Sequence, residues 1–171
     1  MSGKWICIVI LSVAVVAGAG LYYLQIYGFY RVVTDHDGDS VQLVSKSDGQ
    51  PITIGYQAFQ AIDSNSSPIR YRACFKAQDS LENLTRAFIA VEFVVPRNAP
   101  GWFDCFDAQR IADHLNSGRA RIFLSHKNIH YGVDRVVAVT TDGQGYIWHE
   151  LNNCGRRAYD GTVGTDDCAA F

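Results

Sequence analysis

The chain has 171 residues, with 15 lysines and arginines, 17 aspartates and glutamates, and five cysteines. This length fits one compact domain and a short additional segment, but not two full domains. The formal net charge of −2 excludes a protein that binds nucleic acid through a basic surface. Because 48% of the residues are hydrophobic and 19% are charged, a globally disordered chain is excluded as well.

The first 30 residues predict a membrane-spanning helix. Residues 5–30 carry no charged side chain, and about 20 apolar residues suffice to cross the hydrocarbon core of a bilayer. Trp5 marks one end of this run. Aromatic side chains, which favour the headgroup level of a membrane, gather at the other end: Tyr22, Tyr23, Tyr27, Phe29 and Tyr30. We therefore expect residues 1–30 to anchor the protein in a lipid bilayer.

Charge predicts the orientation of this helix. Lys4 and the terminal amine precede it, whereas Arg31 is soon followed by three aspartates. Because basic flanks stay cytoplasmic, we expect a cytoplasmic N-terminus and an exported remainder. A cleaved signal peptide is the alternative, since residues 17–19 (AGA) resemble a cleavage site. The apolar run continues for ten residues beyond Gly20, which favours a retained anchor.

Small residues lie along the same helix. Ala14 and Gly18 are four residues apart and share a face, and Ser12 is a further small residue nearby. This spacing lets a second helix approach closely. The alternative is that small residues are simply common in membrane helices. The first interpretation predicts that the protein is a subunit of a membrane protein complex.

The cysteines agree with export. Cys7 lies within the predicted anchor, where it is a small apolar residue. The other four are an even number, which in an oxidising compartment predicts two disulfides with three possible connectivities. A bond between Cys154 and Cys168 would close a short loop and leave Cys74 to pair with Cys105. The absence of a C-x-x-C pattern removes the usual signature of a zinc ribbon, a redox pair or a haem attachment site.

Residues 31–40 are polar and predict a linker, and residues 41–171 predict an exported α+β domain. The first elements expected in this domain are a hairpin of strands 41–45 and 52–56 around a turn. A half-buried strand is expected at 69–75, where apolar residues alternate with arginines. A buried strand is expected at 89–95, ahead of a proline.

Two helices interrupt these strands. Asp79 and Glu82 form the pattern of a capping box, which predicts a helix over residues 80–88. Asp107 as N-cap and Gly118 as terminator predict a second helix between them.

Three more strands follow, at 120–124, 134–141 and 146–151, the last two joined by the turn residues Asp142-Gly143-Gln144-Gly145. The predicted fold is thus a transmembrane helix followed by a small, mainly antiparallel sheet with two short helices and two disulfides. Residues 152–171 form its glycine-rich tail.

Metal and nucleotide motifs are incomplete. Asp35, Asp37 and Asp39 begin like a calcium loop, but serine and lysine replace the required glycine and glutamate, so we interpret them as a solvated linker. His126 and His130 are four residues apart in a predicted turn, with His149 on the neighbouring hairpin; hydrogen-bonded histidines are the simpler interpretation than a metal site. No glycine-rich phosphate loop or nucleophile elbow occurs. We expect no cofactor, metal or nucleotide.

The segment Pro100–Phe106 (PGWFDCF) places three aromatic residues around a cysteine. This composition favours a disulfide packed in the core, with an exposed docking patch as the alternative. The side chains considered for docking, from this segment and the later hairpin, are Trp102, Phe103, Phe106, His130, Tyr131, Trp148 and His149.

Several segments resemble a family of uncharacterised alphaproteobacterial proteins: GAGLYYLQIY, SSPIRYRACF, APGWFDCFDA, NIHYGVDRVVAV and GYIWHELNNCGRRAYDGT. The resemblance covers nearly the whole chain. It implies a short single-pass protein of a Gram-negative inner membrane with a small periplasmic domain, and it implies no chemical activity.

We therefore expect a non-enzymatic accessory subunit of a bacterial inner-membrane complex, with a respiratory-chain complex or supercomplex as the first choice. The partner would be an integral membrane protein complex, contacted through the helix and the periplasmic domain. The alternatives are a membrane-tethered periplasmic binding or assembly factor and, less favoured, an enzyme that uses His130 and His149.

Overall fold

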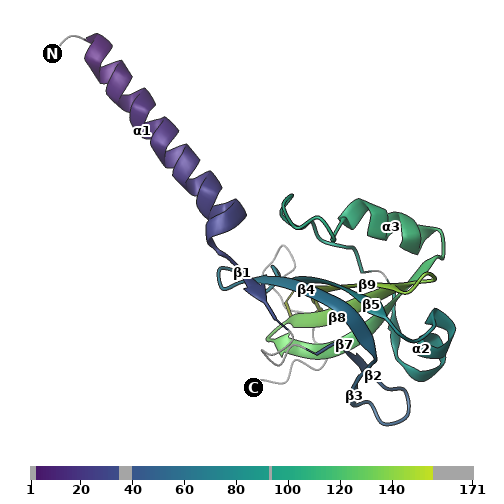
Figure 1. Ribbon diagram of the computed structural model, residues 1–171. Helices are drawn as coiled ribbons and strands as arrows, with labels where there is room; N and C mark the ends of the chain where they lie inside the picture. The colour runs from purple at the N-terminus through teal and green to yellow at the C-terminus, as the bar shows by residue number, and fades with distance from the viewer. Residues whose placement is uncertain (1–2, 35–39, 93, 156–171) are drawn as a thin grey trace. The chain divides into compact units, whose positions relative to one another are not determined.

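Figure 1 shows the computed structural model, which describes residues 3–34, 40–92 and 94–155. The chain divides into two compact units, residues 1–30 and 31–171. The first contains α1 (Gly3–Tyr23) and a π-helical turn, η1 (Leu24–Gly28). Together they form one apolar segment of 26 residues that is long enough to cross a membrane and has none of its most apolar stretch buried.

The second unit is built on a seven-stranded sheet in the order β1-β4-β5-β9-β8-β7-β6. The pairings from β4 through to β6 are all antiparallel. A second sheet of two strands, β2 and β3, is also antiparallel. The strands are β1 (Tyr30–Val33), β2 (Gln42–Val44), β3 (Pro51–Thr53), β4 (Tyr56–Ser64), β5 (Arg72–Ala77), β6 (Ala90–Val91), β7 (Ala120–His130), β8 (Val133–Thr140) and β9 (Gln144–Leu151).

The main core lies on one face of the sheet. Phe75, Phe123, Val137 and Ile147 point into it from four neighbouring strands, and Leu84 of α2 (Leu81–Ala87) packs against them. Full burial of such a side chain stabilises the fold by about 1.5–3 kcal/mol. Strands β8 and β9 are buried almost throughout because the opposite face is covered too.

The opposite face is covered by residues 94–107, which lead from β6 to α3 (Ala108–Asn116) and are called the covering segment below. A disulfide between Cys74 and Cys105 ties this segment to β5. The Phe106 ring packs edge-on against Tyr146 and Trp148 of β9, with ring centroids 5.9 and 6.3 Å apart. The covering segment therefore closes a second, aromatic core.

Several predicted elements are confirmed. The hairpins β2–β3 and β8–β9 form around the expected turns. Helix α3 begins at Asp107, whose carboxylate accepts hydrogen bonds from two backbone N–H groups of the first turn, and Gly118 follows its end with φ of +72°. Helix α2 is also present, but its N-cap is Ser80, whose hydroxyl accepts from the Asn83 N–H; the predicted cap Asp79 was one residue early.

Other elements differ from prediction. Residues 31–33 belong to β1 rather than to a linker. This edge strand buries only Val33, and its exposed residues led to the prediction of a linker. The nine-residue strand β4 was not expected, because a bulge between Gln57 and Gln60, with φ of +53° at Ala58, breaks its alternation. The predicted strand 89–95 shrinks to the two residues of β6 at the sheet edge.

The predicted turn around His126 and His130 is instead the second half of β7. Two register shifts interrupt this half, and Asn128 has a positive φ of 51°. These irregularities place polar residues where a regular strand would have apolar ones, which is why the sequence suggested a turn.

One of the two predicted disulfides, Cys74–Cys105, is found among the described residues. The pairing of Cys154 with Cys168 stays a prediction, because Cys168 lies outside the described residues. The aspartates at 35, 37 and 39 and the tail from residue 156 lie outside them too.

The double substitution Cys74→Ala/Cys105→Ala is expected to lower the free energy of unfolding by about 3–4 kcal/mol, because the bond links residues 31 positions apart and restricts the unfolded chain. Urea unfolding of the full-length protein in detergent measures the change. Cys7→Ala is the matched control, since Cys7 is a free cysteine on α1. Equal unfolding midpoints for the double variant and the parent would contradict the role assigned to this bond.

Candidate functional site

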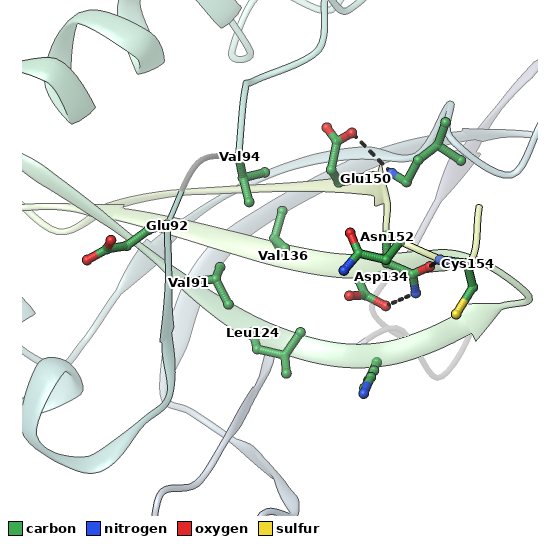
Figure 2. A pocket seen from close by; sticks show the side chains of 12 residues that line it. Val91, Glu92, Val94, Leu124, Asp134, Val136, Glu150, Asn152 and Cys154 are labelled. Carbon is green, nitrogen blue, oxygen red and sulfur yellow. Dashed lines mark hydrogen bonds between the residues drawn. The ribbon is translucent and has the colours of Figure 1, made fainter. Parts of the chain in front are cut away.

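A cleft of about 380 Å³ opens beside the first residues of the covering segment. Figure 2 shows its apolar side chains, with Leu124 on β7, Val136 on β8, Val91 at the end of β6 and Val94 just beyond that strand. The remaining lining residues are mostly polar: Glu92, Lys127, Asp134, Glu150, Leu151, Asn152, Asn153 and Cys154. The volume is at the lower end of the range for ligand sites, so the cleft can accommodate one or two side chains or a small molecule.

One wall of the cleft is held by a hydrogen-bond network. The Asp134 Oδ1 atom accepts from the Asn128 N–H at 2.8 Å and from the Asn152 side-chain amide at 2.7 Å. The Asn152 Oδ1 atom accepts in turn from the N–H groups of Cys154 and Gly155, at 3.0 and 3.2 Å. These bonds fix residues 152–155 against the β7–β8 connection.

Close backbone contact supports the same wall. Gly132 has φ of +74°, and a Cβ atom added to it would lie 2.5 Å from the Gly155 Cα atom. The Gly132 carbonyl also accepts a hydrogen bond from the Asn152 N–H at 3.0 Å. Glycine is therefore required at position 132 both for its backbone conformation and for this approach.

Glu150, next to Asp134 on the neighbouring strand β9, joins the cleft to the covering segment. Its carboxylate accepts hydrogen bonds from the Arg97 guanidinium at 2.6 and 3.2 Å, and from the Leu151 N–H at 3.1 Å. Asp134 and Glu150 are direct cross-strand partners. The two carboxylates do not form an acid and base pair, because Glu150 is held by a cation on both oxygens and Asp134 is fixed by amide donors.

The histidines lie apart from this cleft. His149 stacks on Tyr71 with ring centroids 4.9 Å apart, and the His130 ring meets it edge-on at 6.2 Å. The His149 Nδ1 atom lies 2.6 Å from the Pro68 carbonyl, and its Nε2 atom accepts from the Arg135 Nε–H at 3.0 Å. The neutral imidazole with its proton on Nδ1 satisfies both bonds.

The surroundings of His149 favour its neutral form. Burial, with a contribution from the nearby Arg135 cation, lowers the pKa of His149 from 6.5 to about 4. Metal binding by His149 would require breaking one of its two ring hydrogen bonds. His126 contacts the Ser125 hydroxyl at 3.3 Å, and no cluster of three potential metal ligands occurs in the described part of the chain.

The candidate docking side chains do not form one exposed patch. Trp148, His149, Phe103 and Phe106 are all buried, so they cannot dock a partner in this structure. Their burial confirms the core interpretation of the segment around Cys105. Of the remaining three, Trp102 is half-buried, whereas His130 and Tyr131 are exposed, the latter to 57%.

The residues of the cleft were largely missed in the sequence, although one signal was present. The turn at Asp142-Gly143 fixes the register of the β8–β9 hairpin, and that register places Asp134 opposite Glu150. No pattern in the sequence indicated that Asn152 and Val94 would line the cleft, because both residues lie outside helices and strands.

Comparison with known sequences places the chain in a family. Residues 41–169 match the sequence pattern of a family of unknown function, DUF6446. The chain belongs to this family. Its match covers the whole of the described sheet domain except β1, so cleft and covering segment both lie within the family region. The expected membership of an uncharacterised family is confirmed. No curated protein and no solved structure matches the chain.

Replacing Gly132 by alanine is expected to destabilise the protein more than the same change at Gly118. Both glycines have φ above +70°, but an added Cβ atom at position 118 meets nothing within 4 Å. Gly118→Ala should cost about 1–2 kcal/mol for backbone conformation alone, and Gly132→Ala at least about 1 kcal/mol more for the overlap with Gly155. Thermal or urea unfolding measures both variants. Equal losses would show that residue 155 is not held against residue 132.

The buried neutral His149 predicts a loss of stability in acid. Between pH 6.5 and pH 4 the unfolded chain binds a proton at this histidine and the folded chain does not. The free energy of unfolding should therefore fall as the pH decreases through this window, by up to about 1.4 kcal/mol per pH unit. His149→Gln, which keeps an acceptor but does not titrate, should flatten this dependence, whereas the control His114→Gln should retain it. An unchanged slope in His149→Gln would contradict the assignment.

Proposed function

We propose that this protein is a non-enzymatic accessory subunit of a bacterial inner-membrane protein complex, anchored by α1, whose periplasmic domain binds a neighbouring protein. The observation that supports this most is the state of the polar groups. His149, Glu150 and Asp134, which an enzyme would need, are each engaged in hydrogen bonds that hold the fold. The cleft that Asp134 and Glu150 line also has the apolar side chains of Val91, Val94, Leu124 and Val136. Such a surface suits binding better than catalysis.

The anchor supports a role within a membrane. The segment Gly3–Gly28 is long and apolar enough to span a bilayer. Ala14 and Gly18 are exposed on α1, and an added Cβ atom at Gly18 meets nothing within 4 Å, so this face can receive another helix closely. A cytoplasmic N-terminus is favoured by Lys4. A respiratory-chain complex is our first choice of partner because of the inner-membrane setting.

A membrane-tethered binding or assembly factor is the second candidate. The open cleft favours it equally, because a transient partner needs the same accessible surface. The two roles differ in stoichiometry: a subunit stays with its complex in near-equal amounts, whereas an assembly factor is recovered with a small fraction of it.

Isolation of the tagged full-length protein in a mild detergent, followed by mass spectrometry, tests the proposal. We expect one membrane complex in a near-equal amount. Gly18→Leu should reduce this recovery by blocking close helix approach, whereas the matched change Val16→Leu, on the other side of the helix, should not. Recovery of the protein as a lone monomer would contradict the proposal, and a strongly substoichiometric partner would favour the assembly factor.

A further inference from the structure

The chain leaves the described part of the domain at the cleft itself. Asn152, Asn153 and Cys154 line the cleft, and Figure 2 shows Cys154 among the labelled side chains around it. Hydrogen bonds from Asn152 to Asp134 and from the Cys154 N–H to Asn152 hold this stretch in place. The description ends at Gly155, and residues 156–171 follow in the sequence. The 156–171 segment therefore starts at the wall of the cleft.

A disulfide would bring the far end of this segment back to the same wall. Cys154 is buried, with 6% of its surface exposed. Because Cys74 and Cys105 are joined and Cys7 lies on α1, Cys168 is the cysteine left to pair with it, as the sequence predicts. The bond forms when the two thiols reduce a protein disulfide, which takes up both electrons and both protons as a dithiol. Residue 168 would then lie beside the cleft.

Charge does not select the occupant of the cleft. The Glu150 carboxylate is paired with the Arg97 guanidinium. Lys127 in the same cleft and Arg121 in an adjoining one offset the two other carboxylates that line it. The lining also has four aliphatic side chains. An uncharged, apolar segment therefore suits this cleft better than a basic or an acidic one.

Such a segment follows Cys168 directly. Residues 169–171 (AAF) are uncharged, and the last of them is aromatic. Three extended residues reach about 10 Å, which is comparable with the dimensions of a cleft of about 380 Å³. From a residue bonded to Cys154, the Phe171 ring can thus enter the cleft, where aliphatic side chains would remove it from water.

We propose that residues 169–171 fill the cleft of their own chain, held there by a Cys154–Cys168 disulfide, with the Phe171 ring packed on Val94 and Val136. The bond keeps these residues at a high effective concentration near the cleft, so their docking needs no tight intrinsic affinity. The docking goes beyond the proposed function and does not depend on it. One consequence does rest on that function: a partner protein that uses this cleft has to displace the ring first.

The test measures how fast a thiol in the cleft reacts in the purified full-length protein in detergent. Val94→Cys provides this thiol in a Cys7→Ala background, and a charged maleimide alkylates it. Phe171→Ser should accelerate alkylation about tenfold, because a docked segment leaves no more than about a tenth of the molecules open. The double variant Cys154→Ala/Cys168→Ala should do the same.

Two controls separate docking from a general change. Tyr159→Ser replaces an aromatic residue within the 156–171 segment and should leave the rate at position 94 unchanged. A thiol introduced by Val95→Cys, at a residue that is 70% exposed and does not line the first cleft, should react at one rate in every variant.

Equal rates at position 94 in the parent and in Phe171→Ser would overturn the inference. An equal acceleration by Tyr159→Ser, or a matching change at position 95, would overturn it too. Protection that survives in Phe171→Ser and grows with protein concentration would assign the cleft to a second copy of the chain instead. Since the assay contains no partner, its failure is distinct from that of the proposed function, which the isolation of a lone monomer would remove.

Discussion

The sheet domain depends on the attachment of the covering segment to β5. Arg72, the first residue of β5, is buried. Its guanidinium donates hydrogen bonds to the carbonyls of Arg97 and Asn98 on the covering segment, and to those of Ile69 and Tyr71 just before the strand. Two residues along β5, Cys74 forms the disulfide with Cys105. A period of two places both anchors on the same face of the strand. A buried charge is costly without such partners, so this arrangement requires the covering segment to lie where it does.

The attachment has consequences for the chemistry of the domain. It brings Arg97 to Glu150, which commits that carboxylate to an ion pair, and it seals Phe106 over Trp148. It also sets the path of the chain near Val94, and this path creates the cleft. The side chains of His149, Glu150 and Asp134 are each held by hydrogen bonds within the fold. The cleft beside Val94 combines apolar and charged side chains, and we propose that it binds another protein.

The sequence predicted the elements whose signals are local. Asp107 with Gly118, and the turn at Asp142-Gly143, determine their structures through short-range hydrogen bonds and backbone conformation, and both were correct. The N-terminal helix could be predicted from the length of its apolar run alone. Elements shaped by distant contacts were missed. The alternation around Arg72 predicted an exposed arginine, yet the covering segment buries it to 5% exposure. The bulges in β4 and β7, the two-residue length of β6 and the cleft itself depend on neighbours far along the chain.

The central claim is that the domain binds a partner beside the covering segment. The most direct measurement is photocrosslinking in intact membranes, with a photoreactive amino acid at position 94 in the cleft wall and, as control, at position 48 in the exposed turn between β2 and β3. The account predicts a crosslink from position 94 to a defined segment of another membrane protein, and none from position 48. The absence of an adduct at position 94, or the same adducts from both positions, would contradict it.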